Sequence, residues 1–272
     1  MTNRIQLCVV ALFALLGTTA FATMAFAKMN GPTGLAVDAK GNLYVASFNS
    51  NQILVYGPTH SPIKARTITN NISGPIGVAV DSQSNVWVAN FSANSVAEYS
   101  TTGLYLGGYA GNPLSGPTAL AVDQMGDAWV VNAASSLVLF DPNSTVVLNE
   151  PVSQLVNGTV LYNVAIGPNG LVAFGSDREL SASYAVDVLT NTPLVAIDGN
   201  LGQALAWDNA QNIYWSNTAG AVLKNGAAFV TLSYIPAGMA VDSKHGLIYF
   251  SNNAGNNVDV YTLAGVFVTT IH

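Results

Sequence analysis

The sequence has few charged side chains: 8 Lys and Arg and 14 Asp and Glu among 272 residues, or 8%, against about 25% in typical globular proteins. Half of the residues are hydrophobic, which excludes intrinsic disorder, because disordered chains are poor in apolar residues and rich in charge. The net charge of −6 argues against a nucleic-acid partner, since phosphate backbones are bound mainly by Lys and Arg.

Cysteine is almost absent: the single Cys8 lies in an N-terminal stretch that predicts a signal peptide over residues 1–27. A positive start (MTNR) is followed by an apolar run and by the cleavage pattern Ala25-Phe26-Ala27. Cleavage after Ala22 and retention of the uncharged residues 5–27 as an anchor are alternatives. After cleavage the chain would have no cysteine, so its stability would rest on a large core. We therefore expect a secreted or periplasmic protein without membrane association once the signal is cleaved.

A short phrase recurs along the chain at intervals of 43, 42, 44, 41 and 34 residues. Its copies are GLAVD, GVAVD, ALAVD, NVAIG, ALAWD and GMAVD, which end at Asp38, Asp81, Asp123, Gly167, Asp208 and Asp242. Each copy is followed by an aromatic-rich strand such as NLYVASF and then by a third and a fourth short strand. A period near 42 residues with four strands per unit predicts an all-β fold, a six-bladed β-propeller of four-stranded antiparallel blades.

The expected propeller is one domain over residues 28–272. Its blades cover approximately residues 31–73, 74–115, 116–159, 160–200, 201–235 and 236–272. Strands that are apolar on both faces agree with this fold, because each blade packs between two neighbours. Only about six residues, 28–33, precede the first inner strand. No N-terminal strand is left to complete the last blade, so we expect closure by face packing, without strand exchange.

Residues 31–57, GPTGLAVDAKGNLYVASFNSNQILVYG, resemble an NHL repeat, in which G-P-x-G-[IL]-A-V-D precedes G-N-x-Y-V-A-[DN]. The resemblance covers residues 31–272 and is poorest in the fourth unit. It implies a propeller whose relatives serve as binding platforms and, in some branches, as enzymes, so it specifies the fold more than the function. The dense charge cluster at residues 177–179 lies in this divergent unit and is either a solvated loop or a contact that the unit has gained.

The repeated aspartates have two interpretations. Carboxylates at one end of the inner strands could ring the axis and bind a cation, or each could begin a tight turn by accepting backbone N–H groups. Repetition in nearly every blade favours the turn, because a site needs one constellation rather than five copies. The residues concerned are Asp38, Asp81, Asp123, Asp208 and Asp242.

Asparagine-rich turns follow the second strand of most units and share a face with the G-P-x-G loops, because strand direction alternates within a blade. Neutral amides beside phenylalanine rings suit an uncharged polar ligand such as a glycan, or a protein partner, on a face made of loops. The candidate ligand-binding residues are Phe48, Asn49, Asn90, Phe91, Asn132, Asn217 and Asn252.

Residues for catalysis are scarce. The three histidines, His60, His245 and His272, lie apart without the spacing of a zinc site, and no GxSxG motif is present. The resemblance to propeller enzymes such as streptogramin lyases and gluconolactonase-like enzymes implies His and Glu in several blades, or Glu and Asp at the channel mouth, and those patterns are missing.

We therefore expect an exported, non-catalytic binding scaffold with no catalytic residues, no metal and no cofactor. Its expected ligand is a protein or a glycan. The main alternative is a metal-dependent propeller hydrolase or lyase, in which Asp and Asn at the channel mouth bind a divalent cation. A third possibility is a structural surface protein that self-associates.

Overall fold

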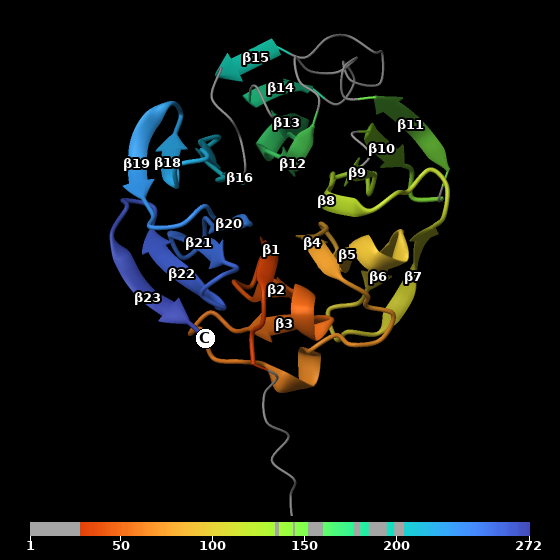
Figure 1. Cartoon of the computed structure of the whole chain (residues 1–272), viewed down its shortest axis with the longest axis horizontal. Helices are drawn as coiled ribbons and strands as arrows, with labels where there is room; N and C mark the ends of the chain where they lie inside the picture. The colour runs from red at the N-terminus through yellow and green to blue at the C-terminus, as the bar shows by residue number, and fades with distance from the viewer. Residues whose placement is uncertain are drawn as a thin grey trace, which may run out of the picture.

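The protein is an all-β molecule in which antiparallel sheets surround a central axis, the arrangement of a β-propeller (Figure 1). The computed structural model describes residues 28–133, 136–143, 145–151, 160–176, 180–184, 195–198 and 204–272. The expected signal peptide and the charge cluster at residues 177–179 lie outside the described residues. Among the helices of the described ranges, none is long and apolar enough to cross a membrane.

Each sheet is built from strands that are consecutive in the sequence. The first sheet contains β1 (Pro32–Val37), β2 (Leu43–Ser47) and β3 (Gln52–Tyr56). The second contains β4 (Pro75–Val80), β5 (Val86–Asn90), β6 (Ser95–Tyr99) and β7 (Tyr105–Ala110). The third contains β8 (Pro117–Val122), β9 (Ala128–Asn132), β10 (Ser136–Phe140) and β11 (Val146–Pro151).

The remaining sheets follow the same order. The fourth contains β12 (Leu161–Ile166), β13 (Leu171–Ser176), β14 (Leu180–Tyr184) and β15 (Val195–Asp198). The fifth contains β16 (Leu205–Trp207), β17 (Ile213–Ser216), β18 (Ala221–Lys224) and β19 (Ala227–Thr231). The last contains β20 (Met239–Asp242), β21 (Leu247–Asn252), β22 (Asn257–Thr262) and β23 (Phe267–Ile271). Short 3-10 turns are η1 (Phe48–Ser50), η2 (Lys64–Arg66), η3 (Phe91–Ala93) and η4 (Pro168–Gly170).

The expectation of four strands in every unit is confirmed for five sheets and wrong for the first, which has three strands. The segment KARTIT, expected as a fourth strand, instead forms η2 and a single antiparallel bridge between Ile68 and Ile53. Arg66 turns inward here: its guanidinium donates to the Tyr44 hydroxyl and to the Thr101 carbonyl. These side-chain contacts replace a regular fourth ladder.

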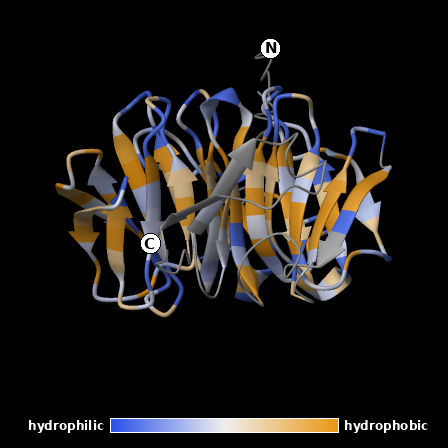
Figure 2. Cartoon of the chain, turned by 90° about the horizontal axis from the view of Figure 1, so that it is seen from above, coloured by the Kyte–Doolittle hydropathy of each residue, from blue (hydrophilic) through white to orange (hydrophobic). Residues whose placement is uncertain are grey.

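The core lies between neighbouring sheets, because the inner strands are buried on both faces. All five residues of β2, β5 and β9 are buried, and hydrophobic colour fills the middle of the strands while hydrophilic colour concentrates in the loops (Figure 2). The recurring aromatic of the second strand is buried in these layers at Tyr44, Trp87, Trp129, Tyr214 and Tyr249. Burial of apolar surface on both faces of a sheet is the main stabilising contribution in such a stack.

The repeated aspartates are turn formers, as the sequence favours. Oδ1 of Asp208 accepts the backbone N–H groups of Ala210 and Asn212, and Oδ2 accepts the Asn212 amide and the Tyr214 hydroxyl. Burial alone would raise the pKa of Asp208, but these hydrogen bonds outweigh it and hold that pKa below its ordinary value. Paired backbone bonds to Oδ1 recur at Asp38, Asp81 and Asp123.

The ring closes between the first and last sheets by packing and side-chain hydrogen bonds, and each described sheet keeps its own consecutive strands, as expected. Oγ of Ser251 donates to the Thr33 carbonyl at 2.6 Å, and the Gly31 N–H donates to Oδ1 of Asn256 at 2.7 Å. Residues from the two ends of the described chain therefore hold the ring shut.

Where the first and last sheets meet, the turn aspartate has a different hydrogen-bond partner from the other units, a histidine. In four other units the turn aspartate accepts a hydrogen bond from the aromatic residue six positions later. Asp242 instead accepts from the His245 ring, with Nδ1 and Oδ2 2.6 Å apart. The Tyr249 hydroxyl lies 3.4 Å from Nε2 of His60 in the first unit, and the two rings meet edge to face.

This contact predicts a pH dependence of stability. Burial lowers the pKa of His60 from 6.5, partly opposed by the charge of Asp242. As the pH falls below the ordinary histidine pKa, His60 becomes protonated in the unfolded chain but stays neutral in the folded protein. Protonation therefore stabilises the unfolded state, and the free energy of unfolding falls as the pH drops from about 7 to 5. The His60→Asn variant, whose side chain tolerates the φ of 62° at this residue, should lose less stability over that range.

The measurement is the unfolding midpoint of wild type, His60→Asn and the control His272→Asn between about pH 7.5 and pH 5. His272 is exposed, so its variant should keep the wild-type slope. Identical slopes in wild type and His60→Asn would contradict a role for His60.

Candidate functional site

The buried members of the expected binding face are tied to backbone. Asn90 and Asn132 are each 1% exposed. The Asn90 side chain accepts the Ser73 N–H and donates to the Asn71 carbonyl. Asn132 likewise accepts the Ser115 N–H and donates to the carbonyl of residue 113. Both amides therefore position the segment that leads into the inner strand of their own sheet, β4 for Asn90 and β8 for Asn132.

The other asparagines of this set act within turns or at the closure. Oδ1 of Asn217 accepts the N–H groups of Ala219 and Ala221, and Oδ1 of Asn252 accepts the Gly255 N–H. The exposed Asn49 donates its amide to the side chain of Asn30. These contacts give each residue a structural role, and ligand binding through them stays a prediction.

The two phenylalanines of the set cover the glycines of the following unit. A Cβ on Gly116 would lie 2.9 Å from the Phe91 ring, and one on Gly74 would lie 3.2 Å from the Phe48 ring. Left-handed asparagines beside them bind the same glycines: Asn51 accepts the Gly74 N–H, and Asn94 accepts the Gly116 N–H, each at 2.7 Å. Asn256 repeats this bond to Gly31 across the closure. This face therefore joins neighbouring sheets.

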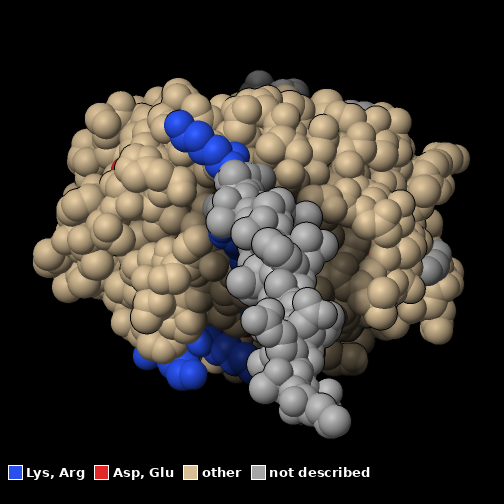
Figure 3. Space-filling model, turned by 90° about the horizontal axis from the view of Figure 1, so that it is seen from below, with Lys and Arg blue, Asp and Glu red and all other residues tan. Residues whose placement is uncertain are grey.

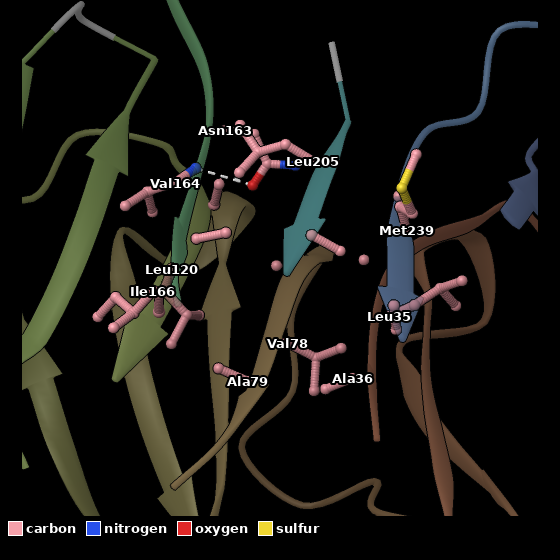
Figure 4. Close-up of a pocket in the computed structure, with 18 of the residues that line it drawn as sticks. Leu35, Ala36, Val78, Ala79, Leu120, Asn163, Val164, Ile166, Leu205 and Met239 are labelled. Atoms are coloured by element: carbon pink, nitrogen blue, oxygen red, sulfur yellow. Dashed lines mark hydrogen bonds between the residues drawn. The ribbon is translucent and has the colours of Figure 1, made fainter. Parts of the chain in front are cut away.

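A cavity of about 280 Å³ runs between the inner strands β1, β4, β8, β12, β16 and β20. Its walls are mostly aliphatic: Leu35, Val78, Leu120, Val164 and Leu205 come from five of these strands (Figure 4). Such a channel favours the apolar part of a ligand, and a small number of polar groups in it would set the ligand's orientation.

The fourth unit supplies the channel's exceptional polar groups. The strand registers place Asn163 of β12 opposite Gly175, in the same way that Gly77 of β4 lies opposite Ala89 and Ala119 of β8 opposite Val131. The equivalent residues around the ring are Gly34, Gly77, Ala119, Asn163, Ala204 and Gly238. Five are glycine or alanine, so this level of the channel gains a polar side chain only at Asn163.

The amide of Asn163 is held in one orientation. Its Oδ1 accepts the backbone N–H of Val164 at 2.8 Å, and the side chain lies beside Leu205 of the neighbouring strand β16 (Figure 4). Within the described ranges Nδ2 forms no hydrogen bond, so it is available as a donor. Tyr162 lies at the irregularity in strand pairing between Leu161 and Asn163 and also lines the cavity. Both residues lie at the end of the channel where the G-P-x-G segments enter the inner strands.

The opposite mouth is acidic. A cavity of about 290 Å³ there is lined by Asp81, Asp123, Asp208 and Trp207. The indole Nε1 of Trp207 is buried without a hydrogen-bond partner. The carboxylates are already occupied by their turns, and in the described residues no three His, Cys, Asp or Glu side chains are grouped to hold a metal ion. This donor set does not fit the divalent cation of the metal-dependent alternative, so we derive no step through a metal.

The closed ring of sheets, with a channel along its axis, defines the protein as a β-propeller. Neither the protein-family models nor the sequences of characterised proteins match the chain, so the expected NHL membership has no support. Its structure is similar to virginiamycin B lyase from Staphylococcus aureus, with 12% identity, 89% and 84% of the two chains covered and a TM-score of 0.62. A streptogramin B lyase matches with 13% identity, 90% and 86% coverage and a TM-score of 0.64. A gluconolactonase from Xanthomonas campestris matches with 14% identity, 84% coverage of both chains and a TM-score of 0.65.

These comparisons contradict the expectation of a non-catalytic scaffold, because the similar propellers are enzymes. At this level of identity they establish the fold alone. The expectation had treated a missing His and Glu pattern as a missing active site.

Sequence reasoning missed Tyr162 and Asn163. A signal was present: the fourth unit reads LYNVAIG where the first three read GPTGLAVD, GPIGVAVD and GPTALAVD. Replacement of a small residue by asparagine in an apolar strand is the local change that marks the channel.

Proposed function

We propose that the protein is a hydrolase or lyase that acts on an ester or lactone bound in the propeller channel and admitted from the face of the G-P-x-G loops. The observation that carries this proposal is Asn163, a fixed amide donor at a level of the channel where the equivalent residues of the other inner strands are glycine or alanine. The likeness to lyase and gluconolactonase propellers supports the same class.

The proposed chemistry follows from the orientation of that amide. The bond from Val164 N–H to Oδ1 turns the two Nδ2 hydrogens away from β12. When water adds to an ester or lactone carbonyl, the carbonyl oxygen gains negative charge, and a preorganised N–H donor lowers this barrier. The ester C–O bond then breaks, and the alcohol leaves with the proton that the water gave up. The Tyr162 hydroxyl is a second neutral donor at the same end of the channel. The aliphatic walls would hold the apolar part of the substrate.

The three-stranded sheet, completed by residues 62–68, would act as the sixth blade. Export by a cleaved signal peptide would place the enzyme in a secreted or periplasmic location. Activity would not require a divalent cation, because the described channel residues lack its ligands.

The test is hydrolysis or ring opening of a panel of aryl esters and lactones by the full chain, with and without EDTA. Ala79→Phe, at a half-buried channel residue, should fill the cavity and abolish turnover, whereas Ala39→Phe in an exposed turn should not. Unfolding midpoints would verify that both variants fold. Absence of turnover in the wild type, or equal turnover in both folded variants, would reject the proposal.

A further inference from the structure

Charge is segregated on the face opposite the G-P-x-G loops, where the first and second strands of each sheet, and the third and fourth, are connected. Residues 67–177 contain no Lys or Arg. The second and third sheets present here a set of half-buried carboxylates, the acidic sector. It comprises Asp81, Glu98, Asp123, Asp127 and Asp141.

The first, fifth and last sheets form the basic sector of the same face. Its cations are Lys40, Arg66, Lys224 and Lys244, of which Lys40 and Lys244 are exposed. The aspartates of these sheets are buried inside their turns, at 6% exposed for Asp38 and 3% for Asp242. The exposed charge of this sector is therefore positive. Figure 3 shows a group of Lys and Arg side chains at one edge of this side of the molecule, a further basic side chain at the opposite edge and hardly any acidic side chain.

The two sectors do not neutralise each other within one molecule. In the described part of the chain, ion-pair distances occur at Arg66 with Asp38, 3.8 Å, and at His245 with Asp242, and neither pair involves the acidic sector. Burial raises the pKa of Asp127, and the charges of Asp123 and Asp141 add to the effect. The acidic sector therefore lacks counter-charges that an incoming surface could supply.

We propose that this face binds a second copy of the chain face to face, with the basic sector of each copy over the acidic sector of the other. A face with one positive and one negative half is complementary to itself about a two-fold axis that lies in the face along the boundary between the halves. With that axis between the first and second sheets, the first sheet of one copy lies over the second sheet of its mate. The last sheet then lies over the third (Figure 1).

This face also carries an exposed apolar side chain that a protein partner would cover. Met125, 81% exposed, projects from the turn between β8 and β9 in the middle of the acidic sector and would be buried against the other copy. The acidic mouth of the channel would be covered, while the mouth with Tyr162 and Asn163 would stay open. Because the proposed dimer leaves that mouth open, dimerisation and the proposed enzyme function are separate. Dimerisation can be tested without measuring turnover.

The experiment is sedimentation velocity of the full chain at several concentrations, in about 0.05 M and about 0.5 M NaCl. We expect a dimer at low salt that dissociates at high salt. The double variants Lys40→Glu/Lys244→Glu and Glu98→Lys/Asp127→Lys should each dimerise at least about tenfold more weakly. An equimolar mixture of the two variants should form a heterodimer, because the sector made more negative in one variant then lies over the sector made more positive in the other, and the two unchanged sectors still face each other.

The control replaces Lys28 and Asn49 by Glu, both on the opposite face near the closure, and should dimerise like the wild type. A wild-type protein that is monomeric at both salt concentrations would overturn the proposal. So would charge-reversed variants that fold and dimerise normally, or a mixture that fails to associate.

Discussion

Replacing Asn163 by alanine should lower kcat by about 10²–10³-fold on any ester or lactone that the wild type turns over, the cost of removing one preorganised donor to a developing oxyanion. The expected loss is in kcat rather than in KM, because the aliphatic walls that bind the ground state are unchanged. The measurement is steady-state kinetics of the wild type and Asn163→Ala on the same substrate.

The fold itself supplies the control for this variant. Alanine occupies the equivalent position at Ala119 and Ala204, so Asn163→Ala should unfold at close to the wild-type temperature. Asn209→Ala, at the opposite mouth of the channel, should retain full kcat. Comparable kcat in Asn163→Ala and Asn209→Ala would remove Asn163 from the mechanism, even if the protein proved to be an esterase.

Most of the fold was predictable because its repeat is local. The turn aspartate binds N–H groups two and four residues away, and the strands that follow it are apolar on both faces. Such features depend on a few neighbouring residues and recur with the period, so the propeller of four-stranded antiparallel blades could be predicted from the sequence, although five sheets rather than six have four strands.

The absence of a fourth strand from the first sheet was not predictable from the same features. The segment KARTIT has β-branched residues suited to a strand, but Arg66 reaches Tyr44 within its own unit and Thr101 in the next. A contact between two units depends on how far apart their sheets lie, and the spacing of the repeats along the sequence does not give that distance. The same holds for His60 and Tyr249, which are 189 residues apart in sequence.

The structural role of the asparagines on the G-P-x-G face was hard to predict for a related reason. Asparagine suits both left-handed turns and ligand binding, so its frequency on the G-P-x-G face did not distinguish Asn94, which ties two sheets together, from a binding residue. Asn163 stands in a strand rather than a turn. An asparagine that interrupts an apolar inner strand has no turn to form, and that context, rather than residue type, separates the two roles.

Gly238→Val should be the most destabilising single substitution of those considered, lowering the free energy of unfolding by about 3 kcal/mol or more. A Cβ at this residue would lie 2.3 Å from the Thr33 carbonyl oxygen and 3.1 Å from the Gly34 Cα. Both are backbone atoms, so no side-chain rotation relieves the overlap. The first and last sheets would have to separate, which would also stretch the 2.6 Å bond from Ser251 to Thr33.

The corresponding change at Gly57 isolates this effect, because the nearest atom to a Cβ there is the Ile63 Cδ1 at 3.7 Å. Gly57→Val should therefore unfold near the wild-type temperature, whereas Gly238→Val should unfold about 6–12 °C lower in a domain of this size. The measurement is thermal unfolding of both variants at a pH near 7.5, where His60 is neutral. Equal midpoints would mean that the ring is not held shut by the close approach of β1 and β20, and that the side-chain bonds of Ser251 and Asn256 suffice.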